Sequence, residues 1–289
     1  MHPAPSVILF TVLSGLGFGM LAWLGLGMPA VTGWVAFGYF FIAYALAVGG
    51  LLASLLHLGN PQRFLKAFLQ WRSSWLSREA WLSVSSLCVM GLFALGAIFF
   101  GGGWSLLGWL GAVLSLVTVY CTSMIYTSLK TVPRWNHPST PVLFVLLSAA
   151  GGALLTGQVI ASVPLLVLAG ACQLLVWHWG DKSFAERGSS IASATGLTGG
   201  DVRLFEGPHT GTSYLTREMV FQVGRKHVRV LRIIAILCMS ILPAALLTLF
   251  HAGYVVVILA AALHIIGVFA ARWLFFAQAE HVVSHYYGR

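Results

Sequence analysis

Long apolar stretches alternate along this chain with short polar or charged segments. A bilayer core of ~30 Å is crossed by about 20 residues of helix, so stretches of this length predict transmembrane spans. The pattern predicts an all-α integral membrane protein, a bundle of eight transmembrane helices forming one domain over residues 1–289. The predicted spans are 6–27, 34–56, 80–100, 104–128, 141–161, 164–180, 233–250 and 254–276.

The connections between these spans are of two alternating kinds. Tiny uncharged turns rich in Gly and Pro suit hairpins that reverse the chain in little space. The other connections are charged. The predicted tiny turns are 28–33, 101–103, 162–163 and 251–253.

The basic residues predict the orientation in the membrane. All 16 Lys and Arg fall in the groups 63–79, 130–134, 182–232 and 272–289, on the side that also holds both termini. Because Lys and Arg mark the inner side of a membrane, both termini are predicted to be cytoplasmic. The net charge of +9 is therefore explained by basic inner loops and anionic lipid, and nucleic acid is not expected as a partner.

Residues 181–232 form a long charged loop on this predicted cytoplasmic side. It begins with a Gly- and Ser-rich linker over residues 188–200. In 214–232, apolar residues at near-helical spacing face basic ones, which predicts an amphipathic helix at the membrane surface. Lipid contact and docking of a partner subunit are both open for this segment.

The sequence holds no motif for demanding chemistry of its own. The four cysteines all fall within predicted spans and none has metal-site spacing, so no metal site is predicted. Bis-histidine haem needs two imidazoles at matched depth on facing helices, and only His264 lies clearly in mid-span, so haem is not expected. We expect His264 to be hydrogen-bonded inside the bundle.

Candidate chemistry gathers at the end of the second span. Gly59 and Pro61 end that helix just after His57, which leaves an imidazole at the membrane boundary with Arg63 nearby. Glu79 opens the third span, where an acidic side chain also suits a helix start. From these residues alone the helix-end interpretation is favoured. The alternative is a quinone pocket, in which a histidine and a carboxylate would carry protons and an arginine would polarise a carbonyl.

The fourth span ends on the same side, in Tyr126-Thr-Ser128-Leu-Lys-Thr-Val-Pro-Arg134-Trp135. Tyr126, Ser128 and Trp135 are candidates to line or cap such a pocket. Taken singly, each residue also suits a helix that ends near a proline beside an interfacial tryptophan.

These two segments carry a family resemblance. Ser-Leu-Leu-His-Leu-Gly-Asn-Pro-Gln-Arg within residues 54–79, and Tyr-Thr-Ser-Leu-Lys-Thr-Val-Pro-Arg-Trp from Tyr126, resemble the membrane-anchor subunit family of dimethyl sulfoxide reductase. The likeness extends over roughly residues 5–180. It implies an eight-helix subunit that binds quinone and anchors a molybdopterin catalytic subunit and an iron–sulfur subunit with four clusters.

The resemblance also changes the weighing of the candidate site. It matches the family's quinone-site histidine to His57, the following arginine to Arg63, and the carboxylate that opens the third span to Glu79. It therefore favours the functional interpretation of these residues. Quinone, either ubiquinone or menaquinone, is the implied cofactor, and none is expected to be covalently bound.

The loop 181–232 departs from the dimethyl sulfoxide enzymes. Its Pro208-His-Thr-Gly and Glu218-Met…Gly-Arg-Lys-His227 are similar to anchors of cytoplasm-facing sulfite dehydrogenases. This likeness implies that electrons from sulfite oxidation pass to the quinone pool of a bacterial inner membrane, with the partners on the cytoplasmic side. Candidate docking residues for those partners are Arg72, Arg134, His209, Arg217, Arg225 and Lys226.

Three rival functions remain open at this stage. An anchor of an S- or N-oxide reductase would run electrons the other way, from quinol, and the residues do not set the direction. A transporter would need a path of buried polar residues, and the spans offer only Gln158, Gln173 and His264. A haem-carrying cytochrome subunit is the third rival, and an absorbance spectrum distinguishes it.

Overall fold

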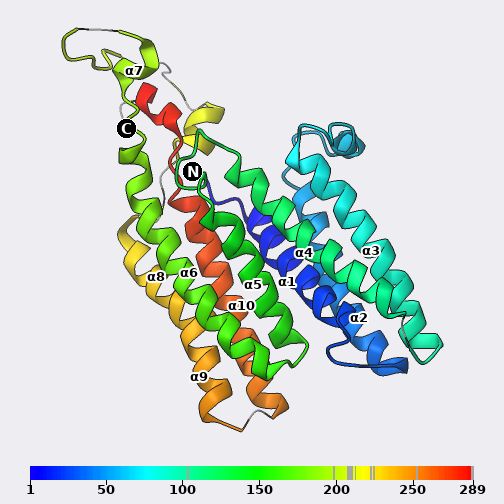
Figure 1. The fold of residues 1–289 in the computed structure, drawn as a ribbon. Coiled ribbons are helices and arrows are strands. Elements are labelled where there is room, and N and C mark those ends of the chain that lie inside the picture. The colour runs from blue at the N-terminus through cyan, green and yellow to red at the C-terminus, as the bar shows by residue number, and fades with distance from the viewer. Residues whose placement is uncertain are drawn as a thin grey trace.

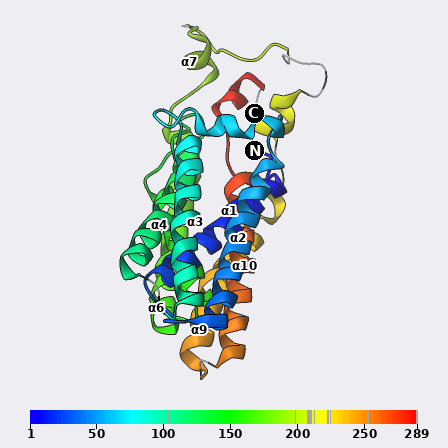
Figure 2. The same ribbon diagram turned by 90° about the vertical axis from the view of Figure 1, so that its right-hand side faces the viewer.

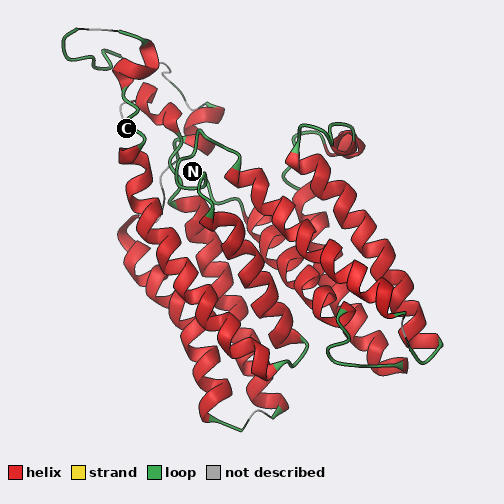
Figure 3. Ribbon diagram, viewed as in Figure 1, coloured by secondary structure: helices red, strands yellow, loops and turns green. Residues whose placement is uncertain are grey.

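The fold is entirely helical in the part of the chain that the structure describes, and no strand is found there (Figure 3). The all-α prediction is therefore confirmed. The structure is a computed structural model, and it describes residues 1–102, 104–197, 199–206, 211, 213–221, 223, 225–251 and 253–287.

Ten α-helices are described, together with shorter helical turns of other types. The α-helices are α1 (Pro5–Gly25), α2 (Gly33–Leu55), α3 (Trp75–Phe99), α4 (Ser105–Thr127), α5 (Ser139–Leu155), α6 (Val159–Glu186), α7 (Ile191–Thr195), α8 (Val228–Ile236), α9 (Leu242–Leu249) and α10 (Tyr254–Ala277). The other turns are η1 (Pro61–Phe68), η2 (Leu215–Met219), η3 (Arg225–His227), η4 (Leu237–Ile241) and η5 (Val282–Tyr287).

Seven helical segments among the described residues are long and apolar enough to cross a membrane. One of them, Val228–Leu249, runs through α8, η4 and α9 without a break. The predicted span 141–161 corresponds to α5, which has only 17 residues. At 1.5 Å per residue α5 is about 25 Å long, shorter than a bilayer core of ~30 Å. A bundle of eight crossings therefore stays a prediction.

The turn between α5 and α6 differs from the sequence prediction. It was expected at 162–163, but those residues lie inside α6, and the chain reverses at 156–158. Gly157 has a φ of +71°, the left-handed conformation with which helices commonly end. Pro164 lies inside α6. Because proline is common at the first turn of a helix, Pro164 led to the prediction that α6 begins there, directly after a turn at 162–163.

The helices form one bundle whose two ends differ (Figure 1). α1 packs against α2, α4 and α5, α3 packs on α4, and α10 packs on α5, α8 and α9. Both termini lie at the end that also carries α7 (Figures 1 and 2). This is the end where the charged connections gather. The cytoplasmic location of that end stays a prediction.

Small residues allow α1 to approach its neighbours closely. A Cβ atom added to Gly17 would overlap the backbone of Ala47 in α2, and one added to Gly19 would overlap the Ser148 carbonyl in α5. Close helix contact through small residues of this kind is typical of transmembrane bundles. At Gly15, by contrast, an added Cβ meets no atom within 4 Å.

We expect Gly19→Ala to destabilise the protein by about 1–3 kcal/mol, because the added methyl group forces α1 and α5 apart. Thermal unfolding of the detergent-solubilised protein measures the change. Gly15→Ala is the matched control in the same helix. It is expected to leave the melting temperature unchanged or to raise it, since alanine favours helix over glycine. Equal melting temperatures for the two variants would contradict the close contact.

A π-helical turn, η4, interrupts the long helical segment Val228–Leu249. His264 of α10 is fully buried beside it, and its Nδ1 lies 2.7 Å from the carbonyl oxygen of Met239 in η4. The expected interior hydrogen bond of His264 is therefore confirmed. Because a carbonyl oxygen can only accept a hydrogen bond, the imidazole Nδ1 is the donor in this contact.

The segment 214–232 does not form one continuous helix in its described residues. A π-helical turn occupies Leu215–Met219, a 3-10 turn occupies Arg225–His227, and α8 begins at Val228 and leads into the bundle. The apolar periodicity of the sequence therefore extends over several short helical pieces. A role of this segment at a lipid or partner surface stays a prediction.

Candidate functional site

The connection from α2 to α3 carries two of the predicted site residues. α2 ends at Leu55, and His57 follows it in an exposed turn. Arg63 lies exposed in η1, which begins at Pro61 and lies across the end of the bundle (Figure 2). The proline occupies the first position of η1, where its missing N–H leaves no carbonyl unpaired.

Glu79 lies in a different environment. It is in the second turn of α3, and only 4% of its surface is exposed. Its Oε1 accepts a hydrogen bond from the Thr122 hydroxyl of α4 at 2.6 Å. No described contact joins Glu79 to His57 or Arg63. The helix-end interpretation does not account for this burial, because a carboxylate that only caps a helix start remains in water.

An apolar groove of about 570 Å³ lies between the α2–α3 connection and the helices α3 and α4. This volume falls within the usual range for small-molecule sites, roughly 300–1,000 Å³. The side chains of the groove are mainly aromatic and aliphatic, and Trp71 and Trp81 are more than half exposed there. The lining residues are Phe68, Leu69, Trp71, Arg78, Trp81, Leu82 and Cys121.

Polar contacts hold the walls of this groove in place. The Trp81 indole N–H donates to the Phe68 carbonyl at 3.0 Å, which ties η1 to α3. Arg78 donates to the carbonyls of Trp71 and Arg72, and its guanidinium lies 4.3 Å from the centroid of the Trp75 ring. Arg78 is thus the cation at the groove, and it precedes Glu79 in the chain.

Sequence reasoning did not single out the groove residues. Trp71 resembled an interfacial anchor, and Arg78 and Trp81 were each plausible as ordinary residues of a helix start. Cys121 comes from α4 and meets them only in the folded protein. The available signal was the aromatic density of residues 68–81, which an interfacial belt explains equally well.

Tyr126 and Trp135 lie together, but away from this groove. Both are buried, and the Tyr126 ring packs against Trp135, Phe144, Phe275 and Phe276. The Trp135 indole N–H donates to the Phe275 carbonyl of α10 at 2.9 Å. Ser128 is exposed at the end of α4. The described contacts therefore assign Tyr126 and Trp135 to an aromatic core that joins α4, α5 and α10.

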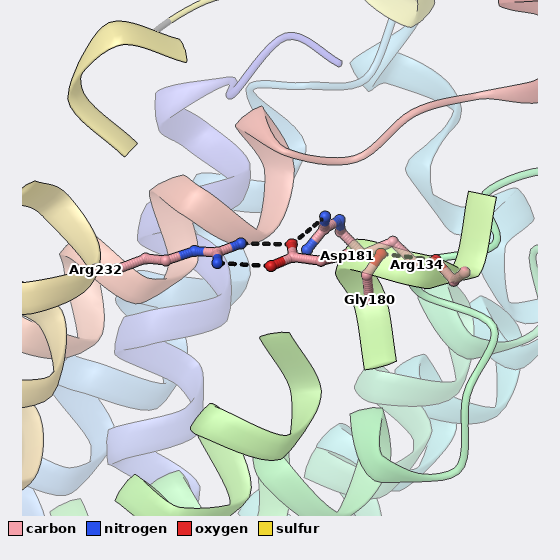
Figure 4. A network of polar contacts seen from close by, with 5 residues as sticks. Arg134, Gly180, Asp181 and Arg232 are labelled. Atoms are coloured by element: carbon pink, nitrogen blue, oxygen red, sulfur yellow. Dashed lines mark hydrogen bonds and ion pairs between the residues drawn. The ribbon is translucent and has the colours of Figure 1, made fainter. Parts of the chain in front are cut away.

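Arg134, a predicted docking residue, belongs to an internal ion-pair network (Figure 4). Its guanidinium lies 2.7 Å from Asp181 of α6, and Arg232 of α8 lies 2.6 Å from the same carboxylate. Arg232 also lies over the Trp177 ring, 5.1 Å from its centroid. The network joins the α4–α5 connection to α6 and α8. Arg134 is consequently engaged within the protein itself.

Of the other predicted docking residues, some are exposed and some lie outside the part of the chain that the structure describes. Arg72, Arg217 and Lys226 are exposed. His209 lies outside the described residues, as does the side chain of Arg225. No group of three His, Cys, Asp or Glu side chains suited to a metal ion occurs within the described ranges.

A second cavity, of about 520 Å³, lies where the two termini meet the loop before α8. The N-terminal amine of Met1 donates to the Ala279 carbonyl at 2.7 Å, beside this cavity. Partial burial lowers the pKa of the His281 imidazole, which lines it. No sequence pattern indicated this cavity, because its walls come from segments that are far apart in the sequence.

Seven long apolar helical segments among the described residues, with the charged connections gathered at one end, define the chain as a multi-pass membrane protein. A family model described as "DMSO reductase anchor subunit (DmsC)" matches residues 1–277. The chain belongs to this family of anchor subunits.

Three curated relatives are similar to the chain. The C subunit of sulfite dehydrogenase from Allochromatium vinosum is 29% identical, and the alignment covers 99% of each protein. The C subunit of anaerobic dimethyl sulfoxide reductase from Escherichia coli K12 is 32% identical over 37% of this chain and 38% of its own length. A second anaerobic dimethyl sulfoxide reductase protein of the same organism, YnfH, is 28% identical over 55% of this chain and 58% of its own.

Proposed function

We propose that this chain is the quinone-reactive anchor subunit of a sulfite-oxidising complex. The proposed partners are a molybdopterin catalytic subunit and an iron–sulfur subunit with four clusters. The observation that carries the proposal is the alignment with the sulfite dehydrogenase protein of Allochromatium vinosum, which covers 99% of each sequence. The concentration of Lys and Arg in the charged connections supports a cytoplasmic position for the partners, at the inner membrane of a bacterium.

Quinone would bind in the apolar groove beside α3. The groove is large enough for a quinone ring, and its exposed Trp71 and Trp81 offer faces for stacking. Reduction of the quinone to quinol takes up two electrons and two protons. The electrons would come from the nearest cluster of the iron–sulfur subunit, and the protons from the aqueous side.

The proposed residue roles follow from exposure and chemistry. His57, exposed at the membrane boundary, would donate a proton or a hydrogen bond to the ring oxygen. Arg63, in the same connection as the groove's Phe68 and Trp71, would orient the ring. Glu79, buried between α3 and α4 and next in sequence to the groove's Arg78, would relay protons to it.

The second candidate function is the anchor of a dimethyl sulfoxide or other S- or N-oxide reductase. The observation that favours it is the 32% identity with the anaerobic dimethyl sulfoxide reductase protein of Escherichia coli. In that function the same groove would bind quinol, and the electrons would leave the anchor toward the catalytic partner.

The test is to purify the complex through a tag on this protein and to assay it in both directions. We expect sulfite to reduce a short-chain quinone in the presence of the purified complex, and a molybdopterin subunit and an iron–sulfur subunit to copurify. Quinol oxidation driven by an S- or N-oxide, without sulfite activity, would establish the second candidate instead. An anchor that purifies alone and reacts with no quinone would contradict both.

A further inference from the structure

Two opposite charges lie buried in the bundle without an ion partner. Glu79 of α3 is 4% exposed and Arg272 of α10 is 3% exposed. Among the described residues Glu79 is the only buried carboxylate, and no carboxylate lies within ion-pair distance of Arg272. Arg272 lay inside the predicted span 254–276, and it belongs to α10, which continues to Ala277.

The surroundings of Arg272 leave its charge uncompensated. Its guanidinium lies 3.4 Å from the centroid of the Phe144 ring of α5, and a cation–π contact of this kind satisfies no N–H. Its Nε is buried and has no hydrogen-bond partner in the described structure. An unpaired charge in the interior of a membrane protein is strongly unfavourable, so a counter-charge or an ordered water is required.

Arg272 lines a small internal cavity of about 10 Å³ together with four hydroxyl side chains, Thr11, Ser14, Thr122 and Ser148. This volume accommodates about one water molecule. Each hydroxyl proton is already used in a hydrogen bond, so the hydroxyl oxygens present lone pairs to the cavity. The acceptors of those protons are the carbonyls of Val7, Phe10 and Gly15 and, for Thr122, the Glu79 carboxylate.

This arrangement selects water over an anion as the occupant. A water molecule accepts from the Nε–H of Arg272 and donates both of its protons to hydroxyl oxygens. An anion would meet the lone pairs of the hydroxyls and would be repelled by them. Thr122 both bonds Glu79 at 2.6 Å and lines the cavity, so the water joins the two buried charges through one hydroxyl group.

We propose that Arg272 is the buried counter-charge of Glu79, linked to it through Thr122 and one cavity water, and that it holds Glu79 as a carboxylate at neutral pH. Opposite charges attract strongly in an interior from which most water is excluded. The link therefore spans α3, α4 and α10, three helices that are distant in sequence.

The other ionisable groups near the pair are few. Arg78 and Cys121 are those on α3 and α4 besides Glu79 and Tyr126. α1 and α5 contribute only hydroxyl groups, backbone and apolar side chains to the cavity. Arg272 is thus the only cation on α10 that faces this cavity. In the proposed quinone reaction Arg272 is a positioning residue, because it acts through Glu79. This role rests on the proposed function, whereas the charge pair of Arg272 and Glu79 does not depend on that function.

The test is infrared spectroscopy of the purified complex at neutral pH. Difference spectra are taken between two proteins that differ only by Glu79→Gln. The difference between wild type and Glu79→Gln isolates the bands of Glu79 and is expected to show a carboxylate. The difference between Arg272→Gln and the double variant Arg272→Gln/Glu79→Gln is expected to show a carboxylic acid instead. Arg272→Lys, which keeps the charge, is expected to retain the carboxylate.

Arg232→Gln is the matched control, because Arg232 pairs with Asp181 and should leave Glu79 ionised. A carboxylic acid in the wild type, or the same state of Glu79 with and without Arg272, overturns the proposal. If Arg272→Gln fails to assemble, the difference spectrum between wild type and Glu79→Gln still tests the proposal, because it shows whether Glu79 is a carboxylate. Because this readout needs no quinone, a complex that is inactive with quinone while Glu79 responds to Arg272 refutes the proposed function alone.

Discussion

Replacement of His57 by alanine is expected to slow quinone reduction by the assembled complex by about 10²–10⁴-fold, the usual contribution of a positioned proton donor. The imidazole is exposed after the end of α2, and its side chain makes no hydrogen bond within the described part of the chain. Its removal should therefore leave the fold intact. The measurement is sulfite-dependent reduction of a water-soluble quinone by the purified complex.

The control for this variant is His251→Ala. His251 is also exposed, but it follows α9 at the opposite end of the bundle. We expect its replacement to leave turnover unchanged. If His57→Ala releases the partner subunits, His57 is structural. If the complex stays intact and turnover is unchanged, the proton-donor role is wrong.

Glu79→Gln is expected to have the second largest effect, about 10²-fold on the same turnover. Glutamine preserves the shape of the side chain and can still accept the hydrogen bond from Thr122, so packing against α4 should survive. It cannot carry a proton. Protons would then have to reach the groove directly from water, and the residual rate should rise as pH falls.

A pH profile of turnover measures this second effect. Glu186→Gln serves as the control, because Glu186 is exposed at the end of α6 and takes no part in the buried network. A normal rate in Glu79→Gln, with the wild-type pH profile, would show that protons reach the quinone by another route. A uniform loss at every pH with a lowered melting temperature would indicate a structural role instead.

The sequence predicted most of the helical architecture because hydropathy reports directly on burial in lipid. Helices Gly33–Leu55 and Tyr254–Ala277 lie within one or two residues of the predicted spans. The turn before α6 was misplaced because Gly157 and Pro164 both suit a helix boundary. Only the conformation of Gly157 decides between them.

The candidate site was less accessible to sequence reasoning. His57, Arg63 and Glu79 could be proposed from local motifs, and their roles stay predictions. The burial of Arg272 could not be foreseen, because an arginine near the end of an apolar run normally reaches water. Its surroundings, Phe144 and Thr122, come from other helices. Tyr126 and Trp135 illustrate the same limit. The sequence around an aromatic residue near a helix end looks the same whether that residue lines a site or packs on α10.

The π turn at Leu237–Ile241 has a consequence for comparing this protein with its relatives. A π turn holds one residue more than an α turn would, so α9 is rotated by about 100° relative to a continuous α-helix through α8. A relative with an uninterrupted α-helix there needs one residue fewer to make the same contacts. An alignment without a gap in this span would pair lipid-facing positions of one protein with core positions of the other.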